Sequence, residues 1–427
     1  MAPPPNHDPA CSGILVTPME SVEHAAAILT QLFVLLVAAK IGDEVFKRLG
    51  QPSLIGEILG GVVVGPAVLN LYQVNNETAL FAEIGVVLLL FKVGLDTRLH
   101  ELVAVGRSAM LVATLGVIFP LVAGFGLAEL LGAPLAVAVF LGAALTATSV
   151  GITSKVLSDL HALHTVSGRI ILGAAVVDDV LALVILAVAS GVAEGNVSPG
   201  RIVTLLLLAI AFIAIVVIGG TRILRRRRSL LTVPRFAESP FLPGMIVMLG
   251  LAAVSASIGL AAIIGAFLAG MVVGESSEKP SLEQEVTPVA AFFTPFFFGF
   301  IGAQVDLAGL ASIQALLLLL GVTLLAVLAK FVGAFLGSID RGGRRATTIA
   351  WAMVPRGEVG IVVAGLGLTT GAIDGELYSV VVGMAVLTTL IVPPLLPRLL
   401  DAAEPERGPM PEDDPDADEE AFAGPPT

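Results

Sequence analysis

The chain has 427 residues, of which 56% are hydrophobic and only 14% are charged, and its mean hydropathy is +0.96. Soluble domains carry about 25% charged residues, so this composition excludes an ordinary soluble domain and indicates a membrane protein. Much of the acid behind the net charge of −12 lies in a C-terminal tail, and no basic face carries interleaved aromatic residues, so no nucleic acid is expected as a partner.

The two ends of the chain differ in composition from everything between them. Residues 1–21 are polar and rich in proline, and no charged-then-apolar leader precedes the first apolar stretch. We therefore expect a disordered extracytoplasmic tail and no cleaved signal peptide. Residues 401–427 are acidic and rich in proline, which predicts a disordered cytoplasmic tail. Residues 22–400 form the predicted transmembrane domain.

The region between the tails divides into apolar segments of membrane-spanning length. A helix needs about 20 mostly apolar residues to cross the hydrocarbon core. This length predicts an all-α polytopic protein with about thirteen transmembrane helices, near residues 22–47, 53–71, 78–96, 106–132, 135–157, 167–193, 200–222, 241–257, 258–274, 286–304, 310–337, 345–370 and 377–399. The weakest division is at Ser257–Gly259, where two short spans could instead be one bent span.

Lysine and arginine are distributed unevenly between the two sets of loops. One set contains nearly all of them, at Lys47, Arg48, Arg98, Arg107, Lys155, Arg169, 225–228, Arg235, Lys279, Arg341, Arg344, Arg345 and Arg398. The other set contains only Arg201. Because basic loops stay in the cytoplasm, this asymmetry predicts a multi-pass protein of the inner (plasma) membrane with its N-terminus outside and its C-terminus in the cytoplasm.

Charged residues also lie within the predicted spans, where they are costly and therefore usually functional. Asp178 and Asp179 fall near the middle of the span 167–193. The other four are Lys330 in the eleventh span, Arg356 and Glu358 in the twelfth, and Lys92 near the cytoplasmic end of the third. These residues are the candidates for an intramembrane site.

Asp178 and Asp179 are adjacent, so their side chains project about 100° apart on a helix and cannot both face one partner. Lys330 is predicted at comparable depth and is the natural partner of one of them, while the other faces a water-filled cavity. Two carboxylates and one ammonium group at close range titrate as a coupled group, which suits a site that exchanges protons and cations. The alternative interpretation is a structural ion pair together with one acid at a helix end.

Two predicted spans carry interruptions at similar depth. Thr146, Thr148 and Ser149 interrupt the apolar sequence of the span 135–157, and Pro355-Arg356-Gly357-Glu358 interrupts the span 345–370. Proline removes a backbone donor and glycine loosens the turn, so we expect local unwinding at both places. The two spans run in opposite directions in the predicted topology. This arrangement is typical of a transporter built from inverted repeats, with its site where the discontinuous helices cross.

Unwound helix ends expose partial charges that side chains can neutralise. We expect Arg356 and Glu358 to compensate for these charges. Thr148 and Ser149, together with freed carbonyl groups, would offer oxygen ligands to a hard cation. The alternative is that these hydroxyl groups, and that of Thr146, only hold helices together, as is common in membranes.

Two further features have a simpler and a functional interpretation. Glu57 lies in the Gly-rich span 53–71, whose small residues favour close helix packing, for example at a dimer interface, over a role in an ion funnel. His100, His161 and His164 lie in predicted cytoplasmic loops and could sense pH, although loop histidines are more often incidental.

Four sequence blocks in order, together with the acid pair, resemble the Kef/NapA-type sodium/proton antiporter branch of the monovalent cation/proton antiporter family. The blocks are QPSLIGEILGGVVVGP (51–66), FAEIGVVLLLFKVGLD (81–96), PFFFGFIGAQVDL (295–307) and VPRGEVG (354–360). The resemblance extends over residues 38–400. It departs from Kef-type efflux systems, which carry a large cytoplasmic nucleotide-binding domain, so nucleotide gating is not expected here.

The resemblance implies a NapA/NhaA-like antiporter fold of thirteen helices and a homodimer. In this fold a core, near 106–193 and 310–399, moves against a dimerisation domain, near 53–71 and 200–274, in an elevator-like cycle.

The resemblance also implies roles for single residues. Asp179 resembles the aspartate that carries the cation and the proton, and Asp178 resembles its neighbour in a salt bridge with Lys330. Two acids at this position go with electrogenic exchange in related antiporters. Glu358 matches a family position near the site whose role stays open.

Together these features predict a secondary active transporter and not an enzyme, since no nucleophile–histidine arrangement is visible. We expect it to exchange a monovalent cation, Na⁺ before Li⁺ or K⁺, for H⁺. No cofactor is expected, and the only metal at Asp178 and Asp179 would be the transported cation. The alternatives are a K⁺/H⁺ antiporter or a channel-like K⁺ efflux protein. A receptor or an organic-anion symporter on the same scaffold is disfavoured by the buried acid pair.

Overall fold

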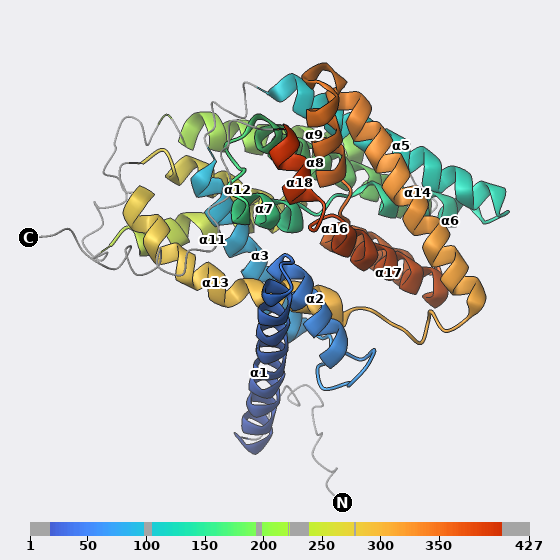
Figure 1. The fold of residues 1–427 in the computed structure, drawn as a ribbon, viewed down its shortest axis with the longest axis horizontal. Coiled ribbons are helices and arrows are strands. Elements are labelled where there is room, and N and C mark those ends of the chain that lie inside the picture. Colours follow the sequence, from blue (N-terminus) through green and yellow to red (C-terminus); the bar gives the residue numbers. More distant parts are fainter. Residues whose placement is uncertain are drawn as a thin grey trace, which may run out of the picture.

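The computed structural model describes residues 18–97, 105–193, 199–220, 222, 239–276 and 279–403. Within these ranges the chain is helical and contains no strand, as its composition predicts (Figure 1). Most of the predicted N-terminal tail, nearly all of the acidic C-terminal tail, the basic run 225–228 and His100 lie outside the described residues.

The helices follow the predicted spans closely. In chain order they are α1 (Pro18–Arg48), α2 (Ser53–Val64), α3 (Asn76–Asp96), α5 (Gly106–Leu130), α6 (Leu135–Thr146), α7 (Val150–Asp159), α8 (Val166–Ala193), α9 (Pro199–Ala214), α11 (Phe241–Ser257), α12 (Ala262–Val273), α13 (Lys279–Ala303), α14 (Ile313–Ser338), α15 (Gly343–Ala352), α16 (Glu358–Thr369), α17 (Gly375–Ile391) and α18 (Leu396–Ala403). A π-helical segment, η2 (Ile215–Gly220), continues α9, and a 3-10 turn, η3 (Ile339–Arg341), follows α14.

Within the described ranges, eight helical segments are long and apolar enough to cross a membrane, and α17 with α18 adds a ninth if the two helices form one bent span. The shorter apolar helices α2, α11, α12 and α16 occupy the remaining predicted spans. The chain is therefore a multi-pass membrane protein. The number of thirteen spans stays a prediction, because these shorter helices have only 10–17 residues.

Three predicted spans differ from the structure in detail. The span 53–71 was predicted too long, because α2 ends at Val64 and the following Gly65-Pro66 cannot continue a helix. The segments on either side of Ser257–Gly259 are two separate helices, joined by a turn in which Gly259 has a φ of 87°. The last span bends by 50° between α17 and α18, where two consecutive prolines lie.

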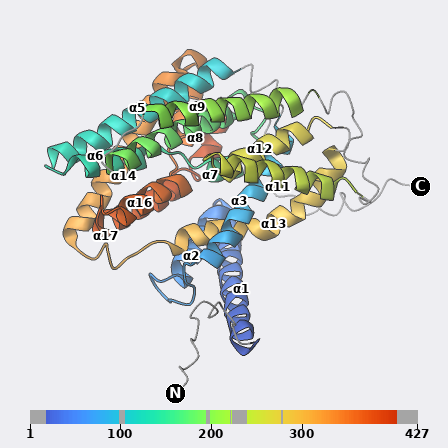
Figure 2. The ribbon, with the colours of Figure 1, turned by 180° about the vertical axis from the view of Figure 1, so that it is seen from behind.

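The helices form two groups that lie side by side (Figures 1 and 2). The scaffold group consists of α1, α2, α3, α11, α12 and α13, and the site group consists of α5, α6, α8, α14, α15, α16 and α17. Helices pack extensively within each group, above all α1 on α2 and α13 on α3 in the first and α14 on α5 in the second. The short helix α7 lies at the junction, because it contacts α3 of the scaffold group and α8 of the site group.

Small residues bring helices of the scaffold group into backbone contact. A Cβ atom on Gly56 of α2 would lie 2.0 Å from the carbonyl oxygen of Gly42 of α1. A Cβ atom on Gly61 would lie 1.9 Å from the carbonyl oxygen of Gly299 of α13. Only glycine permits such an approach. The close packing predicted for this Gly-rich segment therefore occurs within the chain, against α1 and α13.

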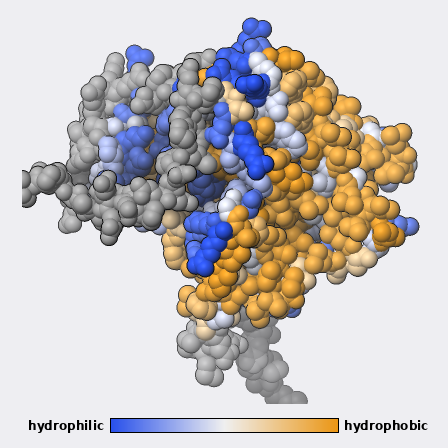
Figure 3. Space-filling view, viewed as in Figure 1, coloured by the Kyte–Doolittle hydropathy of each residue, from blue (hydrophilic) through white to orange (hydrophobic). Residues whose placement is uncertain are grey.

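The outer surface of the site group is apolar. The helix α14 exposes a row of large aliphatic side chains, namely Ile313, Leu317, Leu320, Leu324 and Leu328. Figure 3 shows the broad apolar surface to which this side of the molecule belongs. An apolar surface of this extent is the normal exterior of a protein that is surrounded by lipid.

Candidate functional site

The two interrupted helices predicted from the sequence are present, and their interruptions touch. The first lies between α6 and α7, and the second lies between α15 and α16. The backbone N–H of Ser149 donates to the carbonyl oxygen of Pro355 at 2.9 Å, and the Thr148 hydroxyl donates to that of Met353 at 3.3 Å. Gly357 permits this contact, because a Cβ atom there would lie 2.4 Å from the Ser149 Oγ.

Asp178 and Lys330 meet at this crossing, as the sequence predicts. The Lys330 Nζ donates to Asp178 Oδ1 at 2.8 Å, and both side chains are fully buried. The second carboxylate oxygen, Oδ2, accepts from the backbone N–H of Thr148 at 2.9 Å. Lys330 also donates to the carbonyl oxygen of Thr146 at 2.7 Å. The pair therefore connects α8 and α14 to both sides of the first interruption.

The orientation of this pair follows the electrostatics of the broken helix. The C-terminal end of α6, at Thr146, carries partial negative charge and receives the ammonium group of Lys330. The carboxylate of Asp178 accepts from the N–H of Thr148, just before the N-cap Ser149, and so lies near the partial positive charge of the N-terminal end of α7. Each charge thus faces a helix end of opposite sign, which offsets part of the cost of burying it.

Asp179 is also buried, with 3% of its surface exposed, and its charge acts on Lys330. It therefore does not face lipid. Being the next residue on α8, it projects about 100° away from Asp178. The structure accordingly places two carboxylates and one ammonium group within one buried cluster.

Arg356 lies in the second interruption and is fully buried. Its Nη2 donates to the carbonyl oxygen of Ala326 at 3.4 Å, and its Nε and Nη1 have no hydrogen-bond partner within the described part of the chain. Its guanidinium charge acts on Lys330 and Asp178. Glu358 is the first residue of α16, and its side chain lies outside what the structure describes.

The second interruption is held by two residues of α17 that the sequence interpretation missed. The backbone N–H of Arg356 donates to the Thr388 Oγ1 at 3.1 Å, and the Thr389 hydroxyl donates to the carbonyl oxygen of Arg356 at 2.7 Å. From α7, Thr153 donates to the carbonyl oxygen of Ala352 at 2.9 Å. The only sequence signal was a pair of adjacent threonines within an apolar span.

The hydroxyl groups of the first interruption have different environments. The Thr146 hydroxyl donates to the carbonyl oxygen of Ala143 within its own helix, so it neither joins two helices nor faces the acid pair. The Thr148 hydroxyl reaches across to the second interruption. The Ser149 Oγ accepts from the N–H of Ile152 and caps α7. Thr148 and Ser149 therefore lie beside Asp178. Their backbone N–H groups donate to Asp178 and to the carbonyl oxygen of Pro355.

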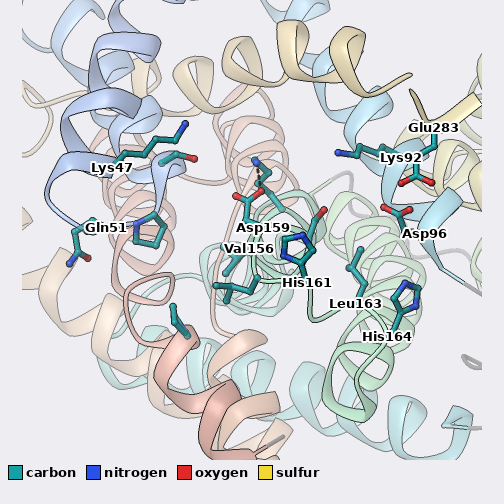
Figure 4. Close-up of a pocket in the computed structure, with 17 residues that line it drawn as sticks. Lys47, Gln51, Lys92, Asp96, Val156, Asp159, His161, Leu163, His164 and Glu283 are labelled. Atoms are coloured by element: carbon teal, nitrogen blue, oxygen red, sulfur yellow. Dashed lines mark hydrogen bonds and ion pairs between the residues drawn. The ribbon is translucent and has the colours of Figure 1, made fainter. Parts of the chain in front are cut away.

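A polar cavity of about 860 Å³ opens between the scaffold group and α7 with the turn that follows it (Figure 4). Lys47 and Lys92 lie on opposite sides of it, with Asp159 between them, and His161 and His164 also line it. A smaller cavity of about 230 Å³ adjoins it, because Lys47, Lys92 and Asp159 line both. These residues belong to the side that the lysine and arginine distribution predicts to be cytoplasmic.

Glu57 lies in the wall of the smaller cavity and is 3% exposed. Its Oε1 accepts from the Lys40 Nζ at 3.3 Å, and the same ammonium group lies 3.2 Å from Asp43 Oδ2. Lys47 completes this network through Asp43 Oδ1 at 3.0 Å. Glu57 and Lys92 therefore lie at the smaller cavity and not beside the acid pair of α8.

The sequence profile described as "Sodium/hydrogen exchanger, transmembrane" matches residues 32–402 of the chain. The chain is 33% identical to the high-affinity Na⁺/H⁺ antiporter NhaS3 of Synechocystis sp., over 90% of this chain and 92% of that protein. It is 35% identical to the Na⁺/H⁺-K⁺ antiporter GerN of Bacillus cereus, over 86% of this chain and 94% of that protein.

The fold is similar to that of a solved structure, the sodium proton antiporter MjNhaP1 from Methanocaldococcus jannaschii. The TM-score is 0.64 at 18% sequence identity, and the match covers 88% of this chain and 97% of the other. The predicted antiporter fold is therefore confirmed. The profile match over most of the chain and the relatives at 33–35% identity lead to one conclusion: the chain belongs to the sodium/hydrogen exchanger family of transmembrane transporters.

Proposed function

We propose that this protein exchanges Na⁺ for protons across the plasma membrane, and that Asp178 and Asp179 form the site where the two ions compete. One observation carries the proposal. A fully buried carboxylate is held between an ammonium group and a helix N-terminus, at the point where two interrupted helices touch. Burying charged groups in a membrane costs free energy, and such groups are usually functional. Binding of a transported ion explains their presence here.

The contacts of Asp178 suggest how the ions compete. Both of its oxygens are engaged, one by Lys330 and one by the N–H of Thr148. A cation that binds between Asp178 and Asp179 must weaken the contact with Lys330, because the ammonium group and the cation repel each other. An unpaired buried ammonium group is costly, so Lys330 releases its proton as the cation binds. When protons bind, these steps run in reverse and the cation is released.

The same arrangement supports an electrogenic cycle. Asp179 exchanges one proton for the cation, and the Asp178–Lys330 pair contributes a second proton. Thr148 and Ser149 supply oxygen ligands to the cation, since a hydroxyl group keeps lone pairs for coordination when it also donates. Arg356, with Glu358, stabilises the second interruption as the site changes charge.

For the transport movement, we propose an elevator-like displacement of the site group against the scaffold group. The polar cavity between the scaffold group and α7, the helix at the junction, supports this assignment, because a movement there would open or close access to the crossing. We further propose inverted repeats, a homodimer through the segments 53–71 and 200–274, and a membrane orientation with the N-terminus outside and the C-terminus in the cytoplasm.

K⁺/H⁺ exchange is the second candidate function. It is favoured by one specific observation, since the relative GerN carries both Na⁺ and K⁺ in its name. The two candidates share the same site and differ in the cation.

Reconstitution into proteoliposomes tests both candidates. Addition of Na⁺, Li⁺ or K⁺ under an imposed proton gradient is followed with a pH-sensitive dye, at clamped voltage. We expect dequenching with Na⁺, its loss in Asp179→Asn, and unchanged exchange in Asp401→Asn, which alters an exposed acid. Full exchange in Asp179→Asn contradicts the site assignment, and cation current without proton movement favours a channel.

A further inference from the structure

One face of α7 leads from the polar cavity to the candidate site. Lys155, Ser158 and Asp159 line both cavities. Gly151 lies four residues before Lys155, which places it on the same face one turn deeper. Two residues further back is Ser149, at the interruption where Thr148 holds Asp178. The lining of the cavity and the interruption are therefore consecutive turns of one short helix.

At Gly151, one turn deeper than the cavity lining, side chains of two scaffold helices pack against α7. A Cβ atom on Gly151 would lie 3.0 Å from the Phe297 Cε1 and 3.1 Å from the Val86 Cγ2. Both side chains are buried, with 4% of their surface exposed.

The same one-turn step occurs on the two scaffold helices. Thr294 of α13 lines the smaller cavity, and Phe297 follows it by three residues. Leu89 of α3 lines the same cavity, and Val86 precedes it by three residues. On three different helices, the residue one turn deeper than the cavity wall contributes to the Phe297–Val86–Gly151 contact.

We propose that cytoplasmic ions and protons reach the acid pair through this cavity and along α7, and that Phe297, with Val86, is the barrier that closes this route on Gly151. The proposal rests on the proposed antiport function. An apolar constriction excludes water and ions without any charged gate. Polar walls lie on its cavity side, at Lys155 and Thr294, and polar groups lie beyond it, at Ser149 and Thr148.

The glycine is part of the barrier. With no Cβ at position 151, the aromatic ring rests directly against the backbone of α7, and the helix can move past the ring. A methyl group at this position must press on the ring, because 3.0 Å is shorter than an ordinary carbon–carbon contact.

Cysteine accessibility tests the barrier without relying on transport. The natural cysteine is removed as Cys11→Ser, and a reporter is placed in the interruption as Ala147→Cys. A second reporter, Ser158→Cys, lies in the cavity wall. Inside-out vesicles are treated with a membrane-impermeant, positively charged methanethiosulfonate reagent, and the rate of modification is measured for each reporter with and without Phe297→Ala.

We expect the cavity reporter to react rapidly in every background. The Ala147→Cys reporter should react slowly when Phe297 is present and about tenfold faster with Phe297→Ala, because the apolar constriction is then opened to water and the reagent. Rapid modification of this reporter with Phe297 in place, or a rate that Phe297→Ala leaves unchanged, overturns the proposal. Phe297→Leu keeps most of the ring volume and should give an intermediate rate, which preserves the test if the alanine variant does not fold.

A second variant separates the barrier from the site. Gly151→Ala should slow Na⁺/H⁺ exchange by about tenfold, because overpacking hinders the movement past the ring, while the cavity reporter reacts as before. Gly321→Ala is the matched control, since a Cβ atom there meets nothing within 4 Å. Equal exchange rates in the two variants contradict the proposal. Loss of exchange in Asp179→Asn with no effect of Phe297 on labelling would leave the site intact and refute only the barrier.

Discussion

Two lysine–carboxylate clusters of the molecule, one at the crossing and one at the cavity, differ in burial. In the site cluster, Lys330 and Asp178 are both fully buried and 2.8 Å apart. In the cavity cluster, Lys40 is 48% exposed and lies 3.3 Å from Glu57. Water can solvate the Lys40 ammonium group when its ion pair with the buried Glu57 opens, whereas neither partner of the site cluster is exposed to water.

The comparison explains why only one cluster is suited to coupled exchange. In the cavity cluster, a passing cation can take the place of Lys40 beside Glu57, because the displaced ammonium group reaches water. In the site cluster, the same displacement leaves a buried charge unpaired, so the cation and the proton must be exchanged together. We therefore propose that the cavity conducts ions to the barrier at Phe297 and that the acid pair behind it couples them.

The largest effect is expected for Lys330→Met. The variant leaves the Asp178 carboxylate buried without its cation, so the free energy of unfolding near neutral pH should fall by about 3–5 kcal/mol. Thermal unfolding in detergent measures the loss. Arg48→Met, which breaks an ion pair with Glu44 that is exposed on both sides, is the control and should cost far less. The double variant Asp178→Asn with Lys330→Met should recover much of the stability, and its failure to do so would show that the pair is not the cause.

For Asp178→Asn we expect a moderate loss in the rate of Na⁺/H⁺ exchange and a clear change in its voltage dependence. The asparagine oxygen can still accept from the N–H of Thr148, so the interruption keeps its shape. One titratable group is lost, and exchange should become insensitive to an imposed potassium-diffusion potential while Na⁺ binding persists. Glu57→Gln should leave the voltage dependence unchanged. Wild-type voltage dependence in Asp178→Asn would exclude this acid from charge coupling.

The threonines of α17 allow the second interruption to be weakened alone. Thr388→Val and Thr389→Val each remove one hydrogen bond to the Arg356 backbone, and each should lower the free energy of unfolding by about 1–2 kcal/mol. The apparent KM for Na⁺ should rise in both, because the crossing loosens. Thr369→Val, at an exposed position of α16, serves as the control. An unchanged KM in the α17 variants would mean that this interruption does not shape the site.

The smallest effect is expected at the rim of the cavity. Lys155 and Asp159 form an ion pair one turn apart on α7, and both are partly exposed. Lys155→Gln should change the free energy of unfolding by about 1 kcal/mol or less, since water and salt screen such pairs. Thermal unfolding at low and high salt checks this expectation. A loss as large as that of Lys330→Met would erase the distinction between the clusters.

Much of this arrangement was predictable from the sequence, and the reason is physical. Charges at Asp178 and Lys330 stand out against an apolar background, and proline and glycine at 355 and 357 mark a break in a helix. The structure contains both helix interruptions and places Lys330 beside Asp178.

The rest could not be predicted because its chemistry lies in backbone atoms or in ordinary apolar residues. The carbonyl of Thr146 and the N–H of Thr148 hold the ion pair, and a sequence does not show where such groups point. Thr388 and Thr389 resemble any hydroxyl residues in a membrane helix. Phe297 is one of several phenylalanines in a row, and only its contact with Gly151 distinguishes it.

The most direct test of the central claim is the apparent KM for Na⁺, measured in proteoliposomes over a range of pH at constant voltage. If cation and proton take turns on the same carboxylates, the KM rises as the pH falls, by about tenfold per pH unit on the acidic side, while the maximal rate at saturating Na⁺ is retained. A KM that is independent of pH, with only the maximal rate changing, would contradict a shared site.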